Sequence, residues 1–128
     1  MILIIDFGSQ FNQLIARRVR ECGVYCTIEP PDISIARIKK LAPRGIILSG
    51  GPASIYDTNS PRVVKGIFTI GLPILGICYG MHYMVDALGG KVKKARKREY
   101  GFAELEVPKA HLYTCAQGCS FAPSTRGV

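Results

Sequence analysis

The stretch that most constrains the fold runs from residue 73 to residue 82, where an apolar segment meets a helical pattern at a cysteine. Residues 73–77 are a short apolar run typical of a buried parallel strand, and residues 79–88 carry apolar residues at helical spacing. Cys78 stands between them, flanked by Gly76 and Gly80 in the order G-x-C-x-G. This is the cysteine form of the G-x-S-x-G elbow, in which small neighbours let a strand and a helix cross closely. We therefore predict a strand–turn–helix unit with Cys78 at the carboxyl edge of a sheet.

The predicted position of Cys78 suits nucleophilic chemistry. A thiol at a helix N-terminus meets unpaired backbone N–H groups and the positive end of the helix dipole, and both favour the thiolate. The alternative is a small buried cysteine that only packs, which is a common role for a free cysteine. The two symmetric glycines favour the nucleophile.

The rest of the chain repeats the alternation of strand and helix. Apolar runs predict strands at residues 2–5, 24–28 and 44–49, and helical patterns follow each of them, at about residues 11–22, 34–42 and 60–68. Such alternation indicates an α/β fold with a doubly wound, mostly parallel sheet and helices on both faces, a flavodoxin-like three-layer arrangement. The first helix has one apolar stripe that we expect to be buried, formed by Phe11, Leu14, Ile15, Val19 and Cys22.

The alternation ends at Gly89 and Gly90. Residues 91–95 and 100–107 read as two further strands. We expect the C-terminal strands of the sheet to be incomplete. From residue 109 the sequence has no sustained period. We predict a partial domain over residues 1–108 and a divergent, loosely ordered tail over residues 109–128.

The net charge of +8 raises the question of nucleic-acid binding. Six of the basic residues lie in residues 91–98, where lysines are typical of a solvated edge strand. No aromatic residue is interleaved to stack on bases, so binding to nucleic acid is the weaker interpretation.

Composition also bears on cellular location and metals. No apolar run is long enough to cross a membrane and the first residues lack the features of a signal peptide, so we expect a cytoplasmic protein. The five cysteines contain no C-x-x-C pair, which suits a reducing compartment. His111, Cys115 and Cys119 lack a fourth ligand, and we expect no metal site.

A second loop belongs to the same predicted sheet edge as Cys78. Ser49, Gly50, Gly51 and Pro52 follow a buried strand, and the glycines leave backbone N–H groups free to approach a ligand. Because parallel strands end at one edge, this loop and Cys78 can face each other. The combination is typical of acyl transfer, with the oxyanion held by the N–H of Tyr79 and by the glycine loop.

Five segments carry a family resemblance: residues 5–10, 14–21, 45–52, 76–81 and 98–101. Together they resemble the class I glutamine amidotransferase domain of the GMP synthase family, from residue 2 to about residue 107. The resemblance implies hydrolysis of glutamine through a cysteinyl thioester. It also implies that ammonia passes to a synthetase (ATP-pyrophosphatase) domain, which uses ATP and Mg²⁺ to aminate xanthosine monophosphate. No cofactor is implied for the amidotransferase domain itself, and the synthetase domain is not in this sequence.

By this resemblance Cys78 is the nucleophile, and Gly51 and Tyr79 supply the oxyanion hole. Gly50 and Pro52 belong to the substrate loop. His82 stands where the family usually has a glutamine close to the bound substrate.

One departure affects the expected activity. The family's general base lies in a His-x-Glu, whereas His111 here is followed by Leu112 and Tyr113. Without that base we expect impaired hydrolysis, unless His82 compensates, and we expect a C-terminally truncated or frame-shifted form of the domain. Two alternatives remain: a non-catalytic remnant that docks on a synthetase subunit, and another cysteine hydrolase of DJ-1-like fold, against which residues 7–10 argue.

Overall fold

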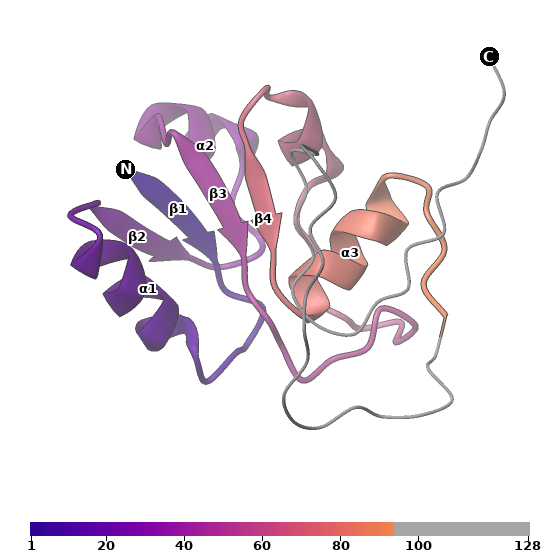
Figure 1. The fold of residues 1–128 in the computed structure, drawn as a ribbon. Helices are drawn as coiled ribbons and strands as arrows, with labels where there is room; N and C mark the ends of the chain where they lie inside the picture. Colours follow the sequence, from indigo (N-terminus) through magenta and orange to yellow (C-terminus); the bar gives the residue numbers. More distant parts are fainter. Residues whose placement is uncertain (94–128) are drawn as a thin grey trace, which may run out of the picture.

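The computed structural model describes residues 1–93, which form one parallel sheet with helices on both faces (Figure 1). The elements in chain order are β1 (Ile2–Ile5), α1 (Asn12–Glu21), β2 (Cys26–Glu29), α2 (Ile35–Leu41), β3 (Gly45–Leu48), the 3-10 helix η1 (Lys65–Thr69), β4 (Ile74–Gly76) and α3 (Tyr79–Ala87). The strand order is β2-β1-β3-β4 and every pair is parallel. The predicted α/β class with a doubly wound parallel sheet is confirmed.

The register of the sheet places the loops after the strands side by side. Ile5, the last residue of β1, pairs with Glu29 in β2 and with Leu48 in β3, and Leu48 pairs with Gly76 in β4. All four strands therefore end at one edge. The polypeptide that leaves β3 and β4 at this edge contains Gly50 and Cys78.

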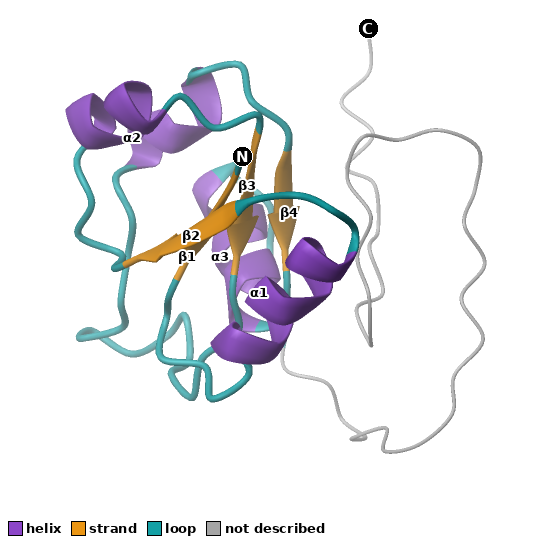
Figure 2. Cartoon of the chain, turned by 90° about the vertical axis from the view of Figure 1, so that its left-hand side faces the viewer, coloured by secondary structure: helices purple, strands orange, loops and turns teal. Residues whose placement is uncertain are grey.

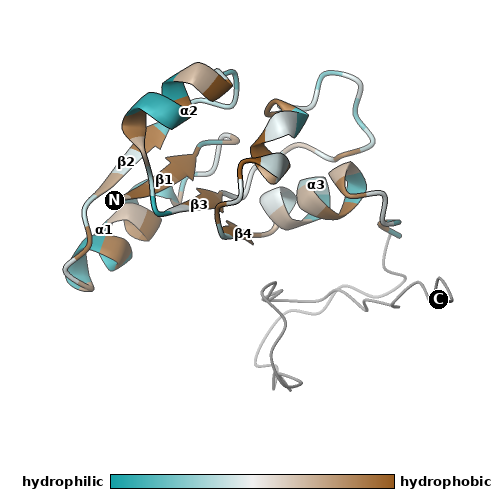
Figure 3. Ribbon diagram, turned by 90° about the horizontal axis from the view of Figure 1, so that it is seen from above, coloured by the Kyte–Doolittle hydropathy of each residue, from teal (hydrophilic) through white to brown (hydrophobic). Residues whose placement is uncertain are grey.

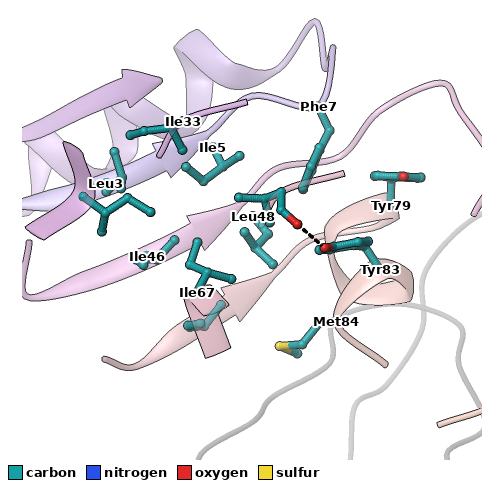
Figure 4. Close-up of a cluster of buried hydrophobic side chains, with 13 residues drawn as sticks. Leu3, Ile5, Phe7, Ile33, Ile46, Leu48, Ile67, Tyr79, Tyr83 and Met84 are labelled. Carbon is teal, nitrogen blue, oxygen red and sulfur yellow. Dashed lines mark hydrogen bonds between the residues drawn. The ribbon is translucent and has the colours of Figure 1, made fainter. Parts of the chain in front are cut away.

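Two apolar clusters hold the layers together, one on each face of the sheet. Alternate strand residues such as Leu3 and Leu48 contact α2, η1 and α3, and Figure 4 shows this larger cluster. On the other face Ile4 packs with Ala16 of α1 and Cys26. Figure 2 shows α1 and α3 on opposite sides of the sheet, and Figure 3 shows that the strands are among the most hydrophobic parts of the chain. None of the helices in residues 1–93 has the length and apolar character needed to cross a membrane.

The prediction for the buried stripe of α1 was right for Ile15 and Val19, which pack against the smaller cluster, and wrong for the other three residues. Phe11 and Leu14 are 61% and 47% exposed, and Cys22 is exposed as well. The buried residues of the helix are Asn12 and Ala16, neither of which belongs to the predicted stripe. Ala16 is small enough for close approach, and its carbonyl oxygen accepts a weak hydrogen bond from Cys26 Sγ at 3.5 Å.

The regular helix predicted at residues 60–68 is also absent, and two tyrosine hydroxyls bond to carbonyl oxygens of this segment. Tyr79 Oη donates to Pro61 O at 2.6 Å. Tyr83 Oη donates to Val63 O at 2.5 Å, the bond drawn as a dashed line at Tyr83 in Figure 4. An α-helix would use these carbonyls for its own i to i+4 bonds. Residues 61–64 are irregular, and only the five residues of η1 form helical bonds.

Other predicted elements agree to within a few residues. Ser34 caps α2, its side chain accepting from the N–H of Arg37, and Gly23 ends α1 at a φ of 71°. Residues 91–93 form no strand. The remainder of the predicted strands at 91–95 and 100–107, the boundary at residue 108, the tail, and the trio of His111, Cys115 and Cys119 lie outside the described residues.

Tyr83 gives a prediction for stability at high pH. Burial raises the pKa of Tyr83 above its ordinary value of 10.0. The folded state therefore keeps a proton that the unfolded chain releases, and this contribution to stability is present below about pH 10 and falls as the pH rises further. In urea unfolding at about pH 8, Tyr83→Phe should cost about 1–3 kcal/mol, since Val63 O loses its donor.

The difference between Tyr83→Phe and the native chain should shrink as the pH rises above about 10. Tyr25→Phe is the matched control, because Tyr25 is 69% exposed and its loss should change little. A cost at Tyr83 that stays constant with pH would contradict this account of the phenol.

Candidate active site

The strand–helix corner holds Cys78 in a backbone conformation that L-residues rarely adopt. Its φ is 49° and its ψ is −112°, and it caps the N-terminus of α3. Its carbonyl oxygen accepts from the N–H groups of Met81 and His82, each at 3.1 Å. Strain of this kind, which costs of the order of 1–3 kcal/mol, is concentrated at functional sites. The result is an exposed thiol at the carboxyl edge of the sheet.

The glycines on either side of Cys78 are required by the close crossing of strand and helix. A Cβ on Gly76 would lie 2.6 Å from Met81 Cα, and a Cβ on Gly80 would lie 2.3 Å from Leu48 O. Both neighbours are backbone atoms that cannot turn aside. The Gly80 N–H also donates to Ser49 O at 3.0 Å, which fixes the first turn of α3 against the end of β3.

The glycine loop after β3 lies directly beside the cysteine. A Cβ on Gly50 would lie 3.5 Å from Cys78 Cβ, and one on Gly51 would lie 2.4 Å from Phe7 O. Ser49, fully buried, joins this loop to the loop after β1: its hydroxyl accepts from the Phe7 N–H at 3.0 Å and donates to Gly50 O at 2.9 Å. Three loops therefore meet at one place on the sheet edge.

Several backbone donors at this place are unused. Within residues 1–93 no hydrogen bond involves the N–H groups of Gly50, Gly51 or Tyr79, whereas the N–H of Gly80 is bonded. Free N–H groups beside an exposed thiol are what an oxyanion requires. The side chain of Tyr79 has another role, because its ring is buried and its hydroxyl bonds to Pro61 O.

The remaining predicted site residues lie around this centre. His82 is half-buried one helical turn after Cys78, and Pro52 is exposed, near Gly8 of the first loop. Sequence reasoning placed Ser49 in the loop but missed its part in joining the two loops. A serine directly after a buried strand is the signal that could have indicated it.

No group of three potential metal ligands gathers within the described part of the chain. An open cleft of about 400 Å³ lies further along the same edge, between the ends of β1 and β2, and includes Asp6 and Glu29. Neither carboxylate is free: Asp6 Oδ1 accepts from the Gly8 N–H at 2.6 Å, and Glu29 pairs with Arg37 at 3.1 Å.

Comparison with known proteins shows what this sequence is similar to. The family model described as "Glutamine amidotransferase class-I" matches residues 3–120. A protein of Thiobacillus denitrificans named GMP synthase [glutamine-hydrolyzing] is 59% identical over 106 residues, covering 83% of this chain and 20% of that protein. The protein of the same name from Lactobacillus gasseri is 56% identical over 114 residues, covering 88% of this chain and 22% of that protein.

A solved structure is also similar. It is the crystal structure of a putative GMP synthase subunit from Thermoplasma acidophilum, which matches with a TM-score of 0.65 and 32% identity. The match covers 78% of this chain and 50% of that one. The chain thus spans about a fifth of the length of the curated relatives and half of the structural one.

The crossing at Gly80 can be tested directly. Gly80→Ala forces its Cβ against Leu48 O, so we expect a loss of about 2–3 kcal/mol or more in the free energy of unfolding. Gly66→Ala is the matched control, because a Cβ there makes only ordinary contact with Ile35 at 3.6 Å. Urea titration should show the first variant destabilised and the second unchanged or slightly stabilised. Equal stability of the two variants would show that the close crossing is not required.

Proposed function

Because the chain belongs to the class-I glutamine amidotransferase family, we propose that its Cys78 edge is the glutamine-hydrolysing site of a GMP synthase. The observation that carries the proposal is the strained, exposed Cys78 beside Gly50, with unused N–H groups around it. The names of the relatives support the assignment to glutamine and GMP synthesis.

The proposed chemistry begins with attack of the Cys78 thiolate on the carboxamide carbon of glutamine. A C–S bond forms, and the carbonyl oxygen becomes an oxyanion held by the N–H groups of Tyr79 and Gly51. Such donors contribute roughly 3–4 kcal/mol each in known cases. The carbonyl re-forms as the C–N bond breaks, nitrogen takes a proton from water and leaves as ammonia, and a glutamyl thioester remains. Water cleaves the thioester, giving glutamate and the free thiol.

Proton transfer is the step for which the chain is least equipped. His82 is the one histidine within the described residues, and the sequence has no His-x-Glu. Because a nucleophile separated from its base loses most of its rate, we propose that the chain alone hydrolyses glutamine slowly. Gly50, Pro52 and His82 are proposed to line the bound substrate.

The partner of this site is proposed to be a GMP synthase synthetase domain or subunit. It would use the ammonia, with ATP and Mg²⁺, to aminate xanthosine monophosphate. The missing His-x-Glu also favours a second candidate, a docking module that binds the synthetase without catalysis.

Ammonia release from glutamine tests the proposal. The native chain, with a GMP synthase synthetase domain added, should release ammonia, and Cys78→Ala should reduce the rate by at least about a hundredfold. Cys22→Ala is the matched control, since Cys22 is also exposed but lies at the C-terminal end of α1.

Two results would count against catalysis at Cys78. Release that survives Cys78→Ala would place the reaction elsewhere. No release from a folded native chain, with or without the synthetase domain, would leave the docking module as the function.

A further inference from the structure

A groove of about 550 Å³ lies between α2 and η1, far along the strands from the cysteine. It includes Ala42 and Pro43, which lead into β3, and Leu72, which leads toward β4. It therefore opens at the amino edge of the sheet. Gly50 and Cys78 follow the opposite ends of the same two strands, so the groove is separate from the proposed glutamine site.

The groove has an aliphatic lining. Ile35 and Ile38 of α2 face it from one side, and Ile70 and Leu72 contribute from the other. All four belong to or pack against the large core cluster, which makes the floor a continuation of the core. The lining contains neither an aromatic residue nor a carboxylate.

One cation lines the groove, and three more are adjacent in sequence to residues of its lining. Lys39 is part of the lining. In the sequence, Lys40 follows Lys39, Arg44 follows the lining residue Pro43, and Lys65 precedes the lining residue Gly66. All four are exposed. They come from α2, from the loop before β3 and from the start of η1, and so are contributed by both sides of the groove.

Within the described residues, no carboxylate forms an ion pair with these cations. The segments that supply the lining, residues 35–43 and 66–72, contain no Asp or Glu, and Asp32 and Asp57 are the nearest acidic residues in the sequence. Two other carboxylates of the described chain pair with cations outside the groove: Glu29 with Arg37 at 3.1 Å and Asp86 with Arg62 at 3.5 Å.

We propose that this groove binds an amphipathic segment of a protein partner that presents aliphatic side chains between carboxylates. Aliphatic anchors match the floor, as in other complexes in which a helix lies in a groove, and carboxylates complement cations on both sides. A nucleic acid would find no aromatic surface on which to stack its bases. The inference is independent of the glutamine site and stands whether or not Cys78 is catalytic.

A labelled peptide provides the test. The probe is a fluorescein-labelled amphipathic helical peptide of leucine, alanine and glutamate, and binding to the full chain is followed by fluorescence anisotropy. Binding should weaken with added salt. The double variant Lys39→Glu with Lys65→Glu should bind about tenfold or more weakly, and Thr69→Trp should also bind more weakly because the indole occupies the groove.

Two matched variants separate the groove from other effects. Lys91→Glu makes the same charge change at an exposed residue after α3, and Cys78→Ala removes the thiol at the other edge. Both should bind the peptide as the native chain does. Urea midpoints for the lysine variants should match the native value, so that a loss of binding is not a loss of folding.

Several outcomes would overturn the proposal. These are absence of binding, equal binding of a peptide with lysine in place of glutamate, and an equal loss in Lys91→Glu. Displacement of the peptide by a single-stranded oligonucleotide at similar concentration would assign the groove to nucleic acid instead.

Discussion

The structure depends on the contact between Gly80 of α3 and the backbone of Leu48 at the end of β3. With no side chain at Gly80, the helix approaches so closely that a Cβ would lie 2.3 Å from Leu48 O. The N–H of Gly80 then bonds to Ser49 O at 3.0 Å. This contact sets where α3 begins, and therefore sets the position and the backbone strain of Cys78.

The same contact brings the second loop into place. Ser49 bonds to the Gly80 N–H through its carbonyl oxygen, and its buried hydroxyl joins Phe7 to Gly50. Gly50 in turn lies against Cys78. The positions of the thiol and the unused N–H groups are thus fixed by backbone contacts, which require little side-chain ordering. This is the preorganisation that stabilisation of an oxyanion requires.

The sequence predicted those features that depend on local backbone chemistry. Strand runs, the serine cap of α2 and the glycines around Cys78 follow from periodicity, capping and the space at a crossing. The sequence-based predictions failed where contacts between distant segments determine which side chains are buried and whether a helix forms. The side of α1 that meets the sheet is centred on the small Ala16, with Ile15 and Val19 beside it, while the larger Phe11 is exposed. The chain near Val63, expected as a helix, is irregular and bonds to a tyrosine hydroxyl from α3. The functions of Cys78, Gly51 and His82 remain proposals.

The two edges of the sheet have different characters. The carboxyl edge presents a thiol and free N–H groups, and the amino edge presents an apolar groove with cations on both sides. A partner bound at the amino edge would leave the carboxyl edge open to substrate. The two proposals therefore place chemistry and docking on separate surfaces of one small sheet.

The most direct test of the central claim is the mass of the chain after incubation with glutamine and rapid acid quenching. A thiol that attacks the carboxamide with an oxyanion hole in place should retain a glutamyl group, located on Cys78 by peptide mapping and absent from Cys78→Ala. A folded native chain that binds glutamine but never carries the group on Cys78 would contradict the account.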